Sequence, residues 1–175
     1  EYANISQKLD EKFPMKLLQA IKKKDLSSIE ELEREIKEID RLREKHIAAG
    51  VLEENSDKIL NVNVKDEKLE DNTMAVLTVY YQDMKQKLDS LNNISDKIVL
   101  LKKILNSKYR KNKKISVNKD AGILIEQVMT KEDIPLKFLS SGEQQELVML
   151  YKLIFKGEKD TIILIDEPEI SLNVS

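Results

Sequence analysis

Apolar side chains recur every three or four residues between residues 28 and 49, which is the spacing of one helical face. The positions on this face are Ile29, Leu32, Ile36, Ile39 and Leu42. Ser28 and Glu31 form a capping box in front of the apolar face, and Ser27 with Glu30 is an alternative pair. The pattern predicts a helix over residues 28–49.

The flanking segments contain residues that begin, break or end helices. Gly50 follows the last turn of the predicted helix, where glycine is a common stop. Residues 4–24 also have helical spacing, but Pro14 disfavours helical geometry in Phe13, so we expect a break there. Residues 51–65 contain several Asn and Asp and are typical of a connector.

A second apolar face has spacings of three and four residues, close to a coiled-coil seam. Its positions are Leu77, Tyr81, Met84, Leu88, Leu91, Ile94, Ile98, Leu101 and Leu105. The one interval out of step falls at Asn92-Asn93, so we predict two helices, 67–91 and 95–107. We expect this face to pack antiparallel on helix 28–49, either as a protruding arm or as an ordinary helix pair.

The hydrophobic period changes in the last third of the chain. Alternating apolar residues at 115–117 predict one strand, and Ile123-Leu124-Ile125 with Val128 predict a second, with a turn at 120–122 between them. A helix is predicted over 142–156. The apolar run 161–165 is typical of a strand buried on both faces.

Composition agrees with a mainly helical chain. Charged residues make up 35% and aromatic residues only 5% of the 175 residues. The fold class we predict is α+β and predominantly helical, with a helical lid or arm and a small sheet. The absence of cysteine and of an apolar run long enough for a bilayer indicates a cytoplasmic protein without a membrane partner.

Ser140, Ser141 and Gly142 precede the helix predicted at 142–156. The first amides of a helix lack internal partners and carry partial positive charge, and glycine lets a ligand approach the backbone. Two hydroxyls beside such amides suit a phosphate group. The alternative is an ordinary serine cap, with Glu143 complementing the helix dipole.

Asp166 and Glu167 follow the apolar run 161–165. Ligands of α/β sheets bind at the carboxyl ends of strands, and a hard cation prefers carboxylate oxygen. We therefore expect Asp166 to hold Mg²⁺ and Glu167 to act as the general base that polarises a water molecule. The alternative is a strand that ends in an acidic turn.

Taken together, Leu139–Gln145 and Thr161–Pro168 resemble the signature motif and the Walker B strand of ABC-type ATPases. Ser141 replaces the first glycine of the family's Leu-Ser-Gly-Gly-Gln pattern, and Glu143 replaces its glutamine. Asn173 stands where the D-loop of the family has its aspartate.

In that family the signature binds the γ-phosphate of ATP held by the opposite protomer. The resemblance therefore implies a homodimer that binds ATP and Mg²⁺, with Ser140 and the Gly142 amide on the phosphate. Asn173 would lie near the dimer axis. The nucleotide-binding set that the resemblance implies is Ser140, Ser141, Gly142, Glu143 and Asn173, beside the metal ligand Asp166 and the base Glu167.

A narrower resemblance is to AAA-family ATPases related to the overcoming-lysogenisation-defect and Septu anti-phage systems. Phe138–Ser175 carries most of it, although these proteins usually have His in place of Asn173. Leu9–Pro14 is similar to the start of their inserted lid. The resemblance implies a piece of a P-loop α/β ATPase, with a helical lid or arm at 1–110 and the signature and Walker B portion at 111–175.

The phosphate-binding loop of such ATPases, Gly-x-x-x-x-Gly-Lys-Ser/Thr, does not occur in the sequence. We therefore interpret the chain as part of a longer protein and expect it to be inactive alone. Two other interpretations remain open. One is a non-enzymatic helical interaction module, and the other is a chromosome-maintenance ATPase, for which a longer coiled coil is expected.

Nine basic residues and no acidic one lie between Lys97 and Lys119. Such a segment can contact the phosphates of a nucleic acid, or it can be a solvated helix end. The residues proposed for contact are Lys108, Arg110, Lys111, Lys113 and Lys114. His46, the only histidine, and the pair Tyr80-Tyr81 are interpreted as packing residues.

Overall fold

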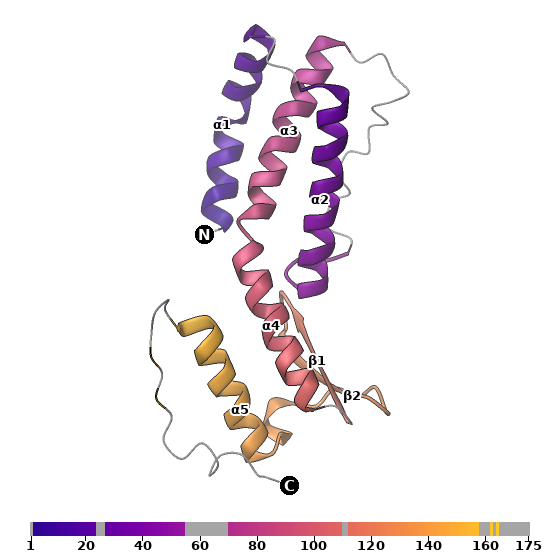
Figure 1. Cartoon of the computed structure of the whole chain (residues 1–175), viewed down its shortest axis with the longest axis vertical. Helices are drawn as coiled ribbons and strands as arrows, with labels where there is room; N and C mark the ends of the chain where they lie inside the picture. The colour runs from indigo at the N-terminus through magenta and orange to yellow at the C-terminus, as the bar shows by residue number, and fades with distance from the viewer. Residues whose placement is uncertain are drawn as a thin grey trace. The chain divides into compact units, whose positions relative to one another are not determined.

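Helices dominate the computed structural model, which describes residues 2–23, 27–54, 70–109, 112–157, 162 and 164 (Figure 1). In chain order the elements are α1 (Tyr2–Lys23), α2 (Ile29–Ala49), α3 (Asp71–Asp89), α4 (Asn92–Lys108), β1 (Lys113–Asn118), β2 (Gly122–Gln127), the 3₁₀ turn η1 (Leu136–Phe138), α5 (Ser141–Tyr151) and the π-helical turn η2 (Lys152–Lys156). The predicted class, mainly helical with a small sheet, is confirmed for these residues. None of the described helices is long and apolar enough to cross a membrane.

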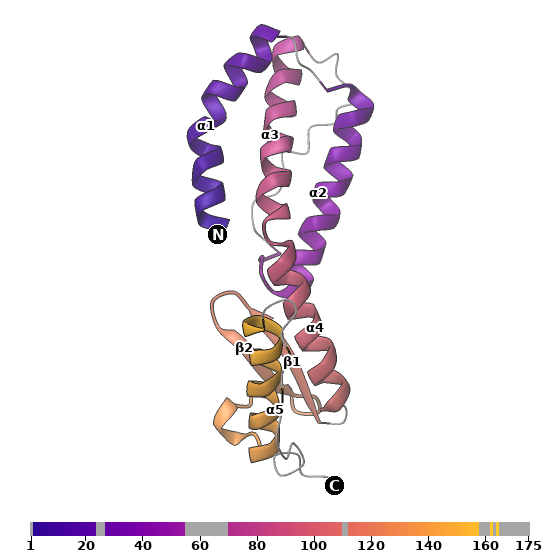
Figure 2. The same ribbon diagram turned by 60° about the vertical axis from the view of Figure 1, so that its left-hand side comes forward.

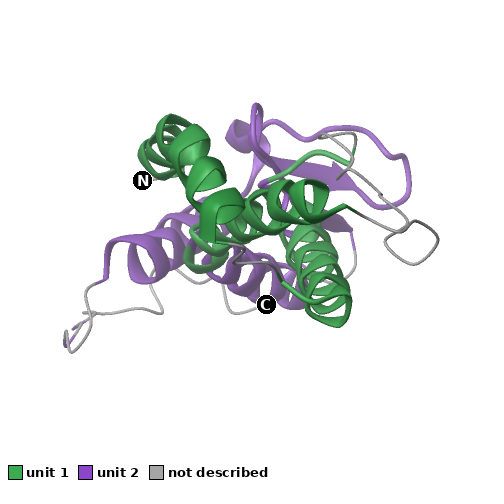
Figure 3. Cartoon of the chain, turned by 90° about the horizontal axis from the view of Figure 1, so that it is seen from above, with its two compact units in different colours: residues 1–48, 52–93 green, residues 49–51, 94–175 purple. Residues whose placement is uncertain are grey.

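The chain forms two compact units (Figure 3). The helical unit contains residues 1–48 and 52–93, and the hairpin unit contains residues 49–51 and 94–175. The division thus falls earlier than the boundary at residue 110 that the sequence suggests. The reason is packing, because Leu101 and Leu105 of α4 lie in one apolar cluster with Ile115 of β1.

In the helical unit, α3 lies between α1 and α2 (Figures 1 and 2). Two ion pairs fix α1 antiparallel to α3. Lys16 Nζ donates to Asp83 Oδ1 at 2.5 Å, and Lys87 Nζ donates to Asp10 Oδ1 at 2.6 Å. The apolar contact of this pair involves Phe13, Ala20, Ala75 and Val79.

The break expected at Pro14 is wrong, because α1 continues through this residue. A proline inside a helix removes one backbone hydrogen bond and costs about 3 kcal/mol. Contacts on both sides of Pro14 offset this cost. Asp10 and Lys16 are both held by α3, and Leu9 and Ala20 are both buried.

The main core of the helical unit lies between α2 and α3. It contains Leu32, Ile39, Leu42, Met74, Leu77, Tyr81 and Leu88. Ser27 N donates to Thr78 Oγ1 at 3.2 Å, and His46 Nε2 lies 2.9 Å from Leu88 O, so the two helices run in the same direction. The predicted antiparallel arrangement is wrong. Hydrophobic spacing specifies the buried face of a helix but not its direction. The segment 50–70 has as many residues as α2, so it is long enough for α3 to begin beside the start of α2.

The predicted split of the second helical block is confirmed, because α3 ends at Asp89 and α4 begins at Asn92. The apolar seam changes partners at this break. Leu88 packs in the cluster with α2, whereas Leu101 and Leu105 pack in the cluster with the hairpin. The expectation that the whole seam covers α2 is therefore wrong for its second half.

The predicted hairpin is confirmed. Strands β1 and β2 pair antiparallel, with Ile115 opposite Ile125, and both of these side chains are buried. Asn118 Oδ1 accepts the backbone N–H groups of Asp120 and Ala121 at 2.8 and 3.0 Å. This local bonding is the usual role of asparagine in a turn.

Asn106 of α4 covers the edge of β1 that does not face β2. Its Nδ2 donates to Ile115 O at 3.0 Å, and Ile115 N donates to its Oδ1 at 2.7 Å. Gly50 also lies against β1. Its φ is +84°, and a Cβ at this position would lie 1.7 Å from Val117 O, so no other residue fits without a backbone shift.

The core of the hairpin unit joins α4, the hairpin and α5. It contains Leu101, Leu105, Tyr109, Ile115, Ile125, Leu139 and Leu147. Leu139 directly precedes the candidate phosphate-binding residues, and Leu147 lies about one helical turn beyond Glu143, the last of them. The start of α5 is therefore anchored from both sides.

The buried strand predicted at 161–165 is wrong at the two described positions. Ile162 and Leu164 are in no strand, and their side chains are 86% and 91% exposed. A buried strand needs neighbours on both sides, and the sheet of the described residues has only β1 and β2. Thr161, Ile163 and Ile165 lie outside the described residues.

Candidate functional site

Ser140 caps α5. Its backbone is extended, with φ −60° and ψ 159°, as expected at an N-cap. Ser140 Oγ accepts Glu143 N at 3.3 Å, and Ser140 N donates to Glu143 Oε2 at 2.8 Å. The two bonds complete a capping box, so the ordinary cap considered as an alternative is present.

The cap leaves hydrogen-bonding capacity at the start of α5. Ser140 and Ser141 are exposed, and Gly142 is half-buried. Because Ser140 Oγ accepts from Glu143, its own O–H remains free to donate to a ligand. The first amides of the helix have no partner within the helix. The arrangement can therefore accept an anion without breaking the capping box.

Gln144 fixes the segment in front of the helix. Its Nε2 lies 3.3, 3.4 and 3.0 Å from the carbonyl oxygens of Leu136, Lys137 and Leu139. One carboxamide thus holds the first two residues of η1 and the residue before Ser140. The sequence analysis did not single out Gln144, and its place in the signature-like motif is the only signal for it.

Glu143 is held by a residue from β1. Lys113 Nζ donates to both Glu143 carboxylate oxygens at 2.6 Å. Burial, the largest contribution, opposes ionisation of Glu143, but the bonds from Lys113 and Ser140 outweigh it and lower the pKa of the carboxyl. Glu143 is therefore a charged carboxylate with a fixed counter-ion.

Tyr109, which follows α4, holds the same residue through the backbone. Its hydroxyl donates to Glu143 O at 2.8 Å. Burial raises the pKa of Tyr109, and the charges of Glu146 and Glu143 raise it further, so the donor stays protonated. The end of α4 and the start of β1 thus both attach to the first turn of α5.

The structure changes the interpretation of the basic segment. Lys108 pairs with the buried Glu146 of α5, and Lys113 pairs with Glu143. These two ammonium groups are thus already paired within the chain. Lys114 is exposed on β1, and its charge adds to burial in lowering the pKa of Lys102. Arg110 and Lys111 lie outside the described residues.

The other predicted site residues are not brought together with Ser140 in what the structure describes. Asp166, Glu167 and Asn173 lie outside the described residues. Among the residues that are described, no group of three or more His, Asp or Glu side chains could hold a metal ion. The structure therefore defines the geometry of Ser140, Ser141, Gly142 and Glu143 alone.

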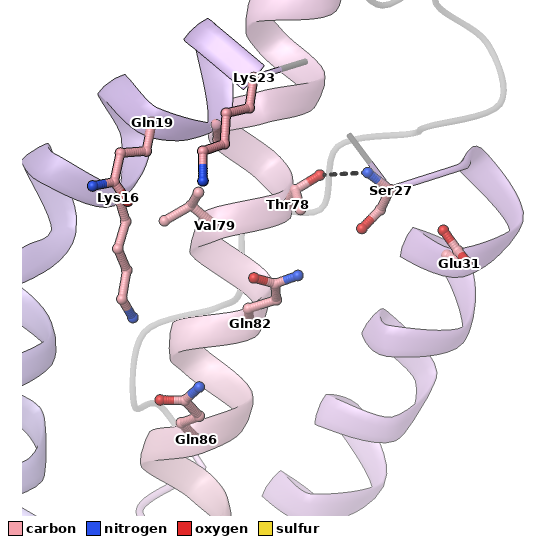
Figure 4. A pocket seen from close by; sticks show the side chains of 10 residues that line it. Lys16, Gln19, Lys23, Ser27, Glu31, Thr78, Val79, Gln82 and Gln86 are labelled. Atoms are coloured by element: carbon pink, nitrogen blue, oxygen red, sulfur yellow. Dashed lines mark hydrogen bonds between the residues drawn. The ribbon is translucent and has the colours of Figure 1, made fainter. Parts of the chain in front are cut away.

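The helical unit contains a cleft of about 410 Å³ along α3 (Figure 4). Its lining residues are Lys16, Gln19, Ala20, Lys23, Ser27, Glu31, Thr78, Val79, Gln82 and Gln86. Lysines extend from α1, and carboxamides extend from both α1 and α3 (Figure 4). The sequence analysis did not predict this cleft, because its lining comes from segments far apart in the chain.

The cleft is mainly polar, and some of its polar groups already have hydrogen-bond or ion-pair partners within the chain. Ser27 N donates to Thr78 Oγ1, as Figure 4 shows, and Lys16 pairs with Asp83. The second oxygen of Asp83 is buried without a hydrogen-bond partner in the described part of the chain. Such a lining can take a polar ligand or a polar segment of a partner.

A second acidic group lies in the groove between α2 and α3. Glu35 Oε2 is buried and has no hydrogen-bond partner among the described residues. Burial raises the pKa of Glu35, and the charge of Glu31 adds to this effect, whereas Lys85 opposes it. Glu35 therefore differs from Glu143, whose pKa moves in the opposite direction.

The interpretation of His46, Tyr80 and Tyr81 as packing residues is confirmed. His46 is fully buried, and its Nε2 lies 2.9 Å from Leu88 O. The rings of Tyr80 and Tyr81 meet edge to face with centroids 5.4 Å apart, and Tyr81 is fully buried.

Comparisons with known proteins add no relative to this picture. A scan against protein-family models, a search of curated proteins and a search of solved structures each found no match.

Proposed function

We propose that the chain is part of an ABC-type ATPase that binds and hydrolyses ATP between two protomers, in an anti-phage or DNA-transaction system. The observation that supports this most is the start of α5, where two exposed serines and a glycine occur in the order of an ABC signature. A second motif, with Asp166 and Glu167, follows in the sequence at the spacing that the Walker B motif has in that family.

The proposed ligand at α5 is the terminal phosphate of ATP held by the second protomer. Ser140 donates its hydroxyl proton, and the amide of Gly142 donates from the helix start. Gln144 and the buried Leu139 support this role, since they fix the segment in front of the donors. A donor that is already held in place loses little conformational entropy when the ligand binds.

The chemical step is assigned to the second motif. Asp166 holds Mg²⁺ and Glu167 polarises the attacking water, while Asn173 lies near the dimer axis. The phosphate-binding loop that grips ATP comes from the remainder of the protein. The chain alone therefore binds nucleotide weakly and does not hydrolyse it. Contact with a nucleic acid remains a proposal for Arg110, Lys111 and Lys114.

Two variants of the complete protein test this function. Glu167→Gln removes the base but keeps its size, so hydrolysis falls about 10²- to 10³-fold and an ATP-bound dimer accumulates. Ser140→Arg puts a bulky cation where the phosphate docks, so each protomer binds ATP but dimers do not form. Ser28→Arg, at the start of α2, is the matched control and leaves dimerisation unchanged.

The two measurements are ATP turnover and sedimentation velocity with and without Mg-ATP. Normal ATP turnover by Glu167→Gln would show that the Walker B assignment is wrong. Dimers that form equally well with Ser140→Arg would remove the signature assignment.

A non-enzymatic helical interaction module is the second candidate. Two observations favour it: the capping box of Ser140 and Glu143 is complete without a ligand, and the polar cleft lies in the helical unit. In this case Ser140→Arg and Glu167→Gln leave the response to nucleotide unchanged. Charge reversal at Lys23 in the cleft then impairs partner binding.

A further inference from the structure

We propose that Lys113 is a positioning residue of the phosphate site, because it neutralises Glu143 where the phosphate must approach. This inference rests on the proposed function, since its ligand is the terminal phosphate of ATP. The contact that carries it is the pair of hydrogen bonds from Lys113 Nζ to the two carboxylate oxygens of Glu143, each 2.6 Å long.

Glu143 presents a difficulty for any anion at the start of α5. Its carboxylate bonds to Ser140 N and therefore lies beside the hydroxyl that is proposed to hold the phosphate. A phosphate in that position meets a like charge at short range, where repulsion is strong. Lys113 brings the opposite charge to the same carboxylate, so the pair has no net charge.

The ion pair is built into the hairpin unit. The side chains of Lys113 and Glu143 are only 21% and 23% exposed, so solvent screens the pair less than it screens a surface pair. Lys113 opens β1 and is paired with Gln127 in the sheet. Tyr109 holds the carbonyl of Glu143. The ammonium group therefore stays on the carboxylate when a ligand arrives.

A purely structural ion pair makes a different prediction from a pair that tunes the phosphate site. If the pair only stabilises the fold, loss of either partner weakens ATP-driven dimerisation, or leaves it unchanged. If Lys113 neutralises Glu143, the two losses have opposite signs. Removal of the lysine leaves a bare carboxylate beside the phosphate, whereas removal of the carboxylate leaves an extra cation there.

The experiment measures the Mg-ATP concentration that gives half-maximal dimer, by sedimentation velocity of the complete protein with Glu167→Gln as the background. Lys113→Met keeps length and removes charge, and it raises this concentration about tenfold or more. Glu143→Gln keeps the capping box and lowers the concentration, because it leaves an extra cation beside the phosphate. The double variant returns to the background value.

Two controls accompany the series. Lys113→Arg keeps the cation and keeps the background value. Lys103→Met removes an exposed charge on α4, outside every proposed binding set, and changes the concentration less than twofold. Urea unfolding of each variant shows whether it is folded, and Glu143→Gln decides the sign alone should Lys113→Met fail to fold.

A Mg-ATP requirement for Glu143→Gln that equals or exceeds the background value overturns the inference, as does an unchanged requirement for a folded Lys113→Met. The proposed function is tested separately by Ser140→Arg. If Ser140→Arg does not change ATP-driven dimer formation, the proposed function is wrong, and this inference is wrong with it. If they respond to Ser140→Arg but not to Lys113→Met, only the role of Lys113 is wrong.

Discussion

The starts of α2 and α5 have the same local structure. In α2, Ser28 N donates to Glu31 Oε2 at 2.9 Å and Glu31 N donates to Ser28 Oγ at 3.2 Å. The corresponding bonds at the start of α5 are 2.8 and 3.3 Å long. Both boxes come from the same Ser-x-x-Glu spacing, which satisfies two amides at a helix start.

Their surroundings differ. Glu31 is exposed, whereas Glu143 is half-buried and bonded by Lys113. In addition, Tyr109 bonds to the carbonyl of Glu143, and Gln144 fixes the residues in front of Ser140. The comparison teaches that a capping box alone marks only a helix start. The tertiary contacts added to one of the two boxes are what make it a candidate site.

We expect the largest change in the free energy of unfolding from the removal of Lys113. Lys113→Met leaves Glu143 charged and half-buried without its counter-ion, which lowers the free energy of unfolding by about 1–2 kcal/mol. Urea unfolding of the chain measures this change. Arg41→Met removes an exposed pair with Glu38 on α2 and serves as the control, for which we expect no measurable change. Equal midpoints for the two variants would show that the buried pair is no stronger than a surface pair.

A smaller effect, equal in the two helices, is expected from loss of the capping hydroxyls. Ser28→Ala and Ser140→Ala each remove one acceptor with nearly the same geometry, so each lowers local helix stability by about 1 kcal/mol. Amide hydrogen exchange at Glu31 and Glu143 reports the two effects separately. A much larger effect at Ser140 would mean that the contacts around α5 depend on its cap.

The smallest effect is a difference in pH dependence. The pKa of Glu143 is lowered, so its contribution to stability is present above the pKa of the unfolded chain and is lost as the pH falls through the folded pKa. The pKa of Glu35 is raised, so its contribution has the opposite sign and is lost as the pH rises. Carboxyl NMR titration should place Glu143 below, and Glu35 above, the ordinary value of 4.5.

Stability measurements can test the same signs. Glu143→Gln should reduce the loss of stability on acidification below about pH 4.5, the ordinary pKa of glutamic acid. Glu35→Gln should leave that loss in place. A Glu143 titration at or above the ordinary value would contradict the fixed ion pair with Lys113.

Much of the secondary structure follows from residues close in sequence. The cap at Ser28, the stop at Gly50 and the turn bonded by Asn118 each depend on neighbours within a few residues. The split before α4 also follows from a local feature, the one interval out of step in the apolar seam. These predictions are confirmed because local hydrogen bonding and side-chain period determine them.

The predictions that failed depend on partners far along the chain. Pro14 lies inside a continuous helix because α3 holds Asp10 and Lys16 on either side of it. Helix α2 runs parallel to α3, although the apolar pattern is the same for both directions. Leu101 of α4 continues the apolar spacing of α3, but it packs in the core of the hairpin unit.

For the candidate site, the sequence by itself identified Ser140, Ser141, Gly142 and Glu143 and the helix that they begin. Only the tertiary structure brought Lys113, Tyr109 and Gln144 to that helix start. The physical reason is that a capping box forms between residues three apart, whereas a counter-ion reaches its carboxylate only when a strand and a helix pack on a common core. The sequence determined where the anion site could begin, and the packing of α4, β1 and α5 decided its charge.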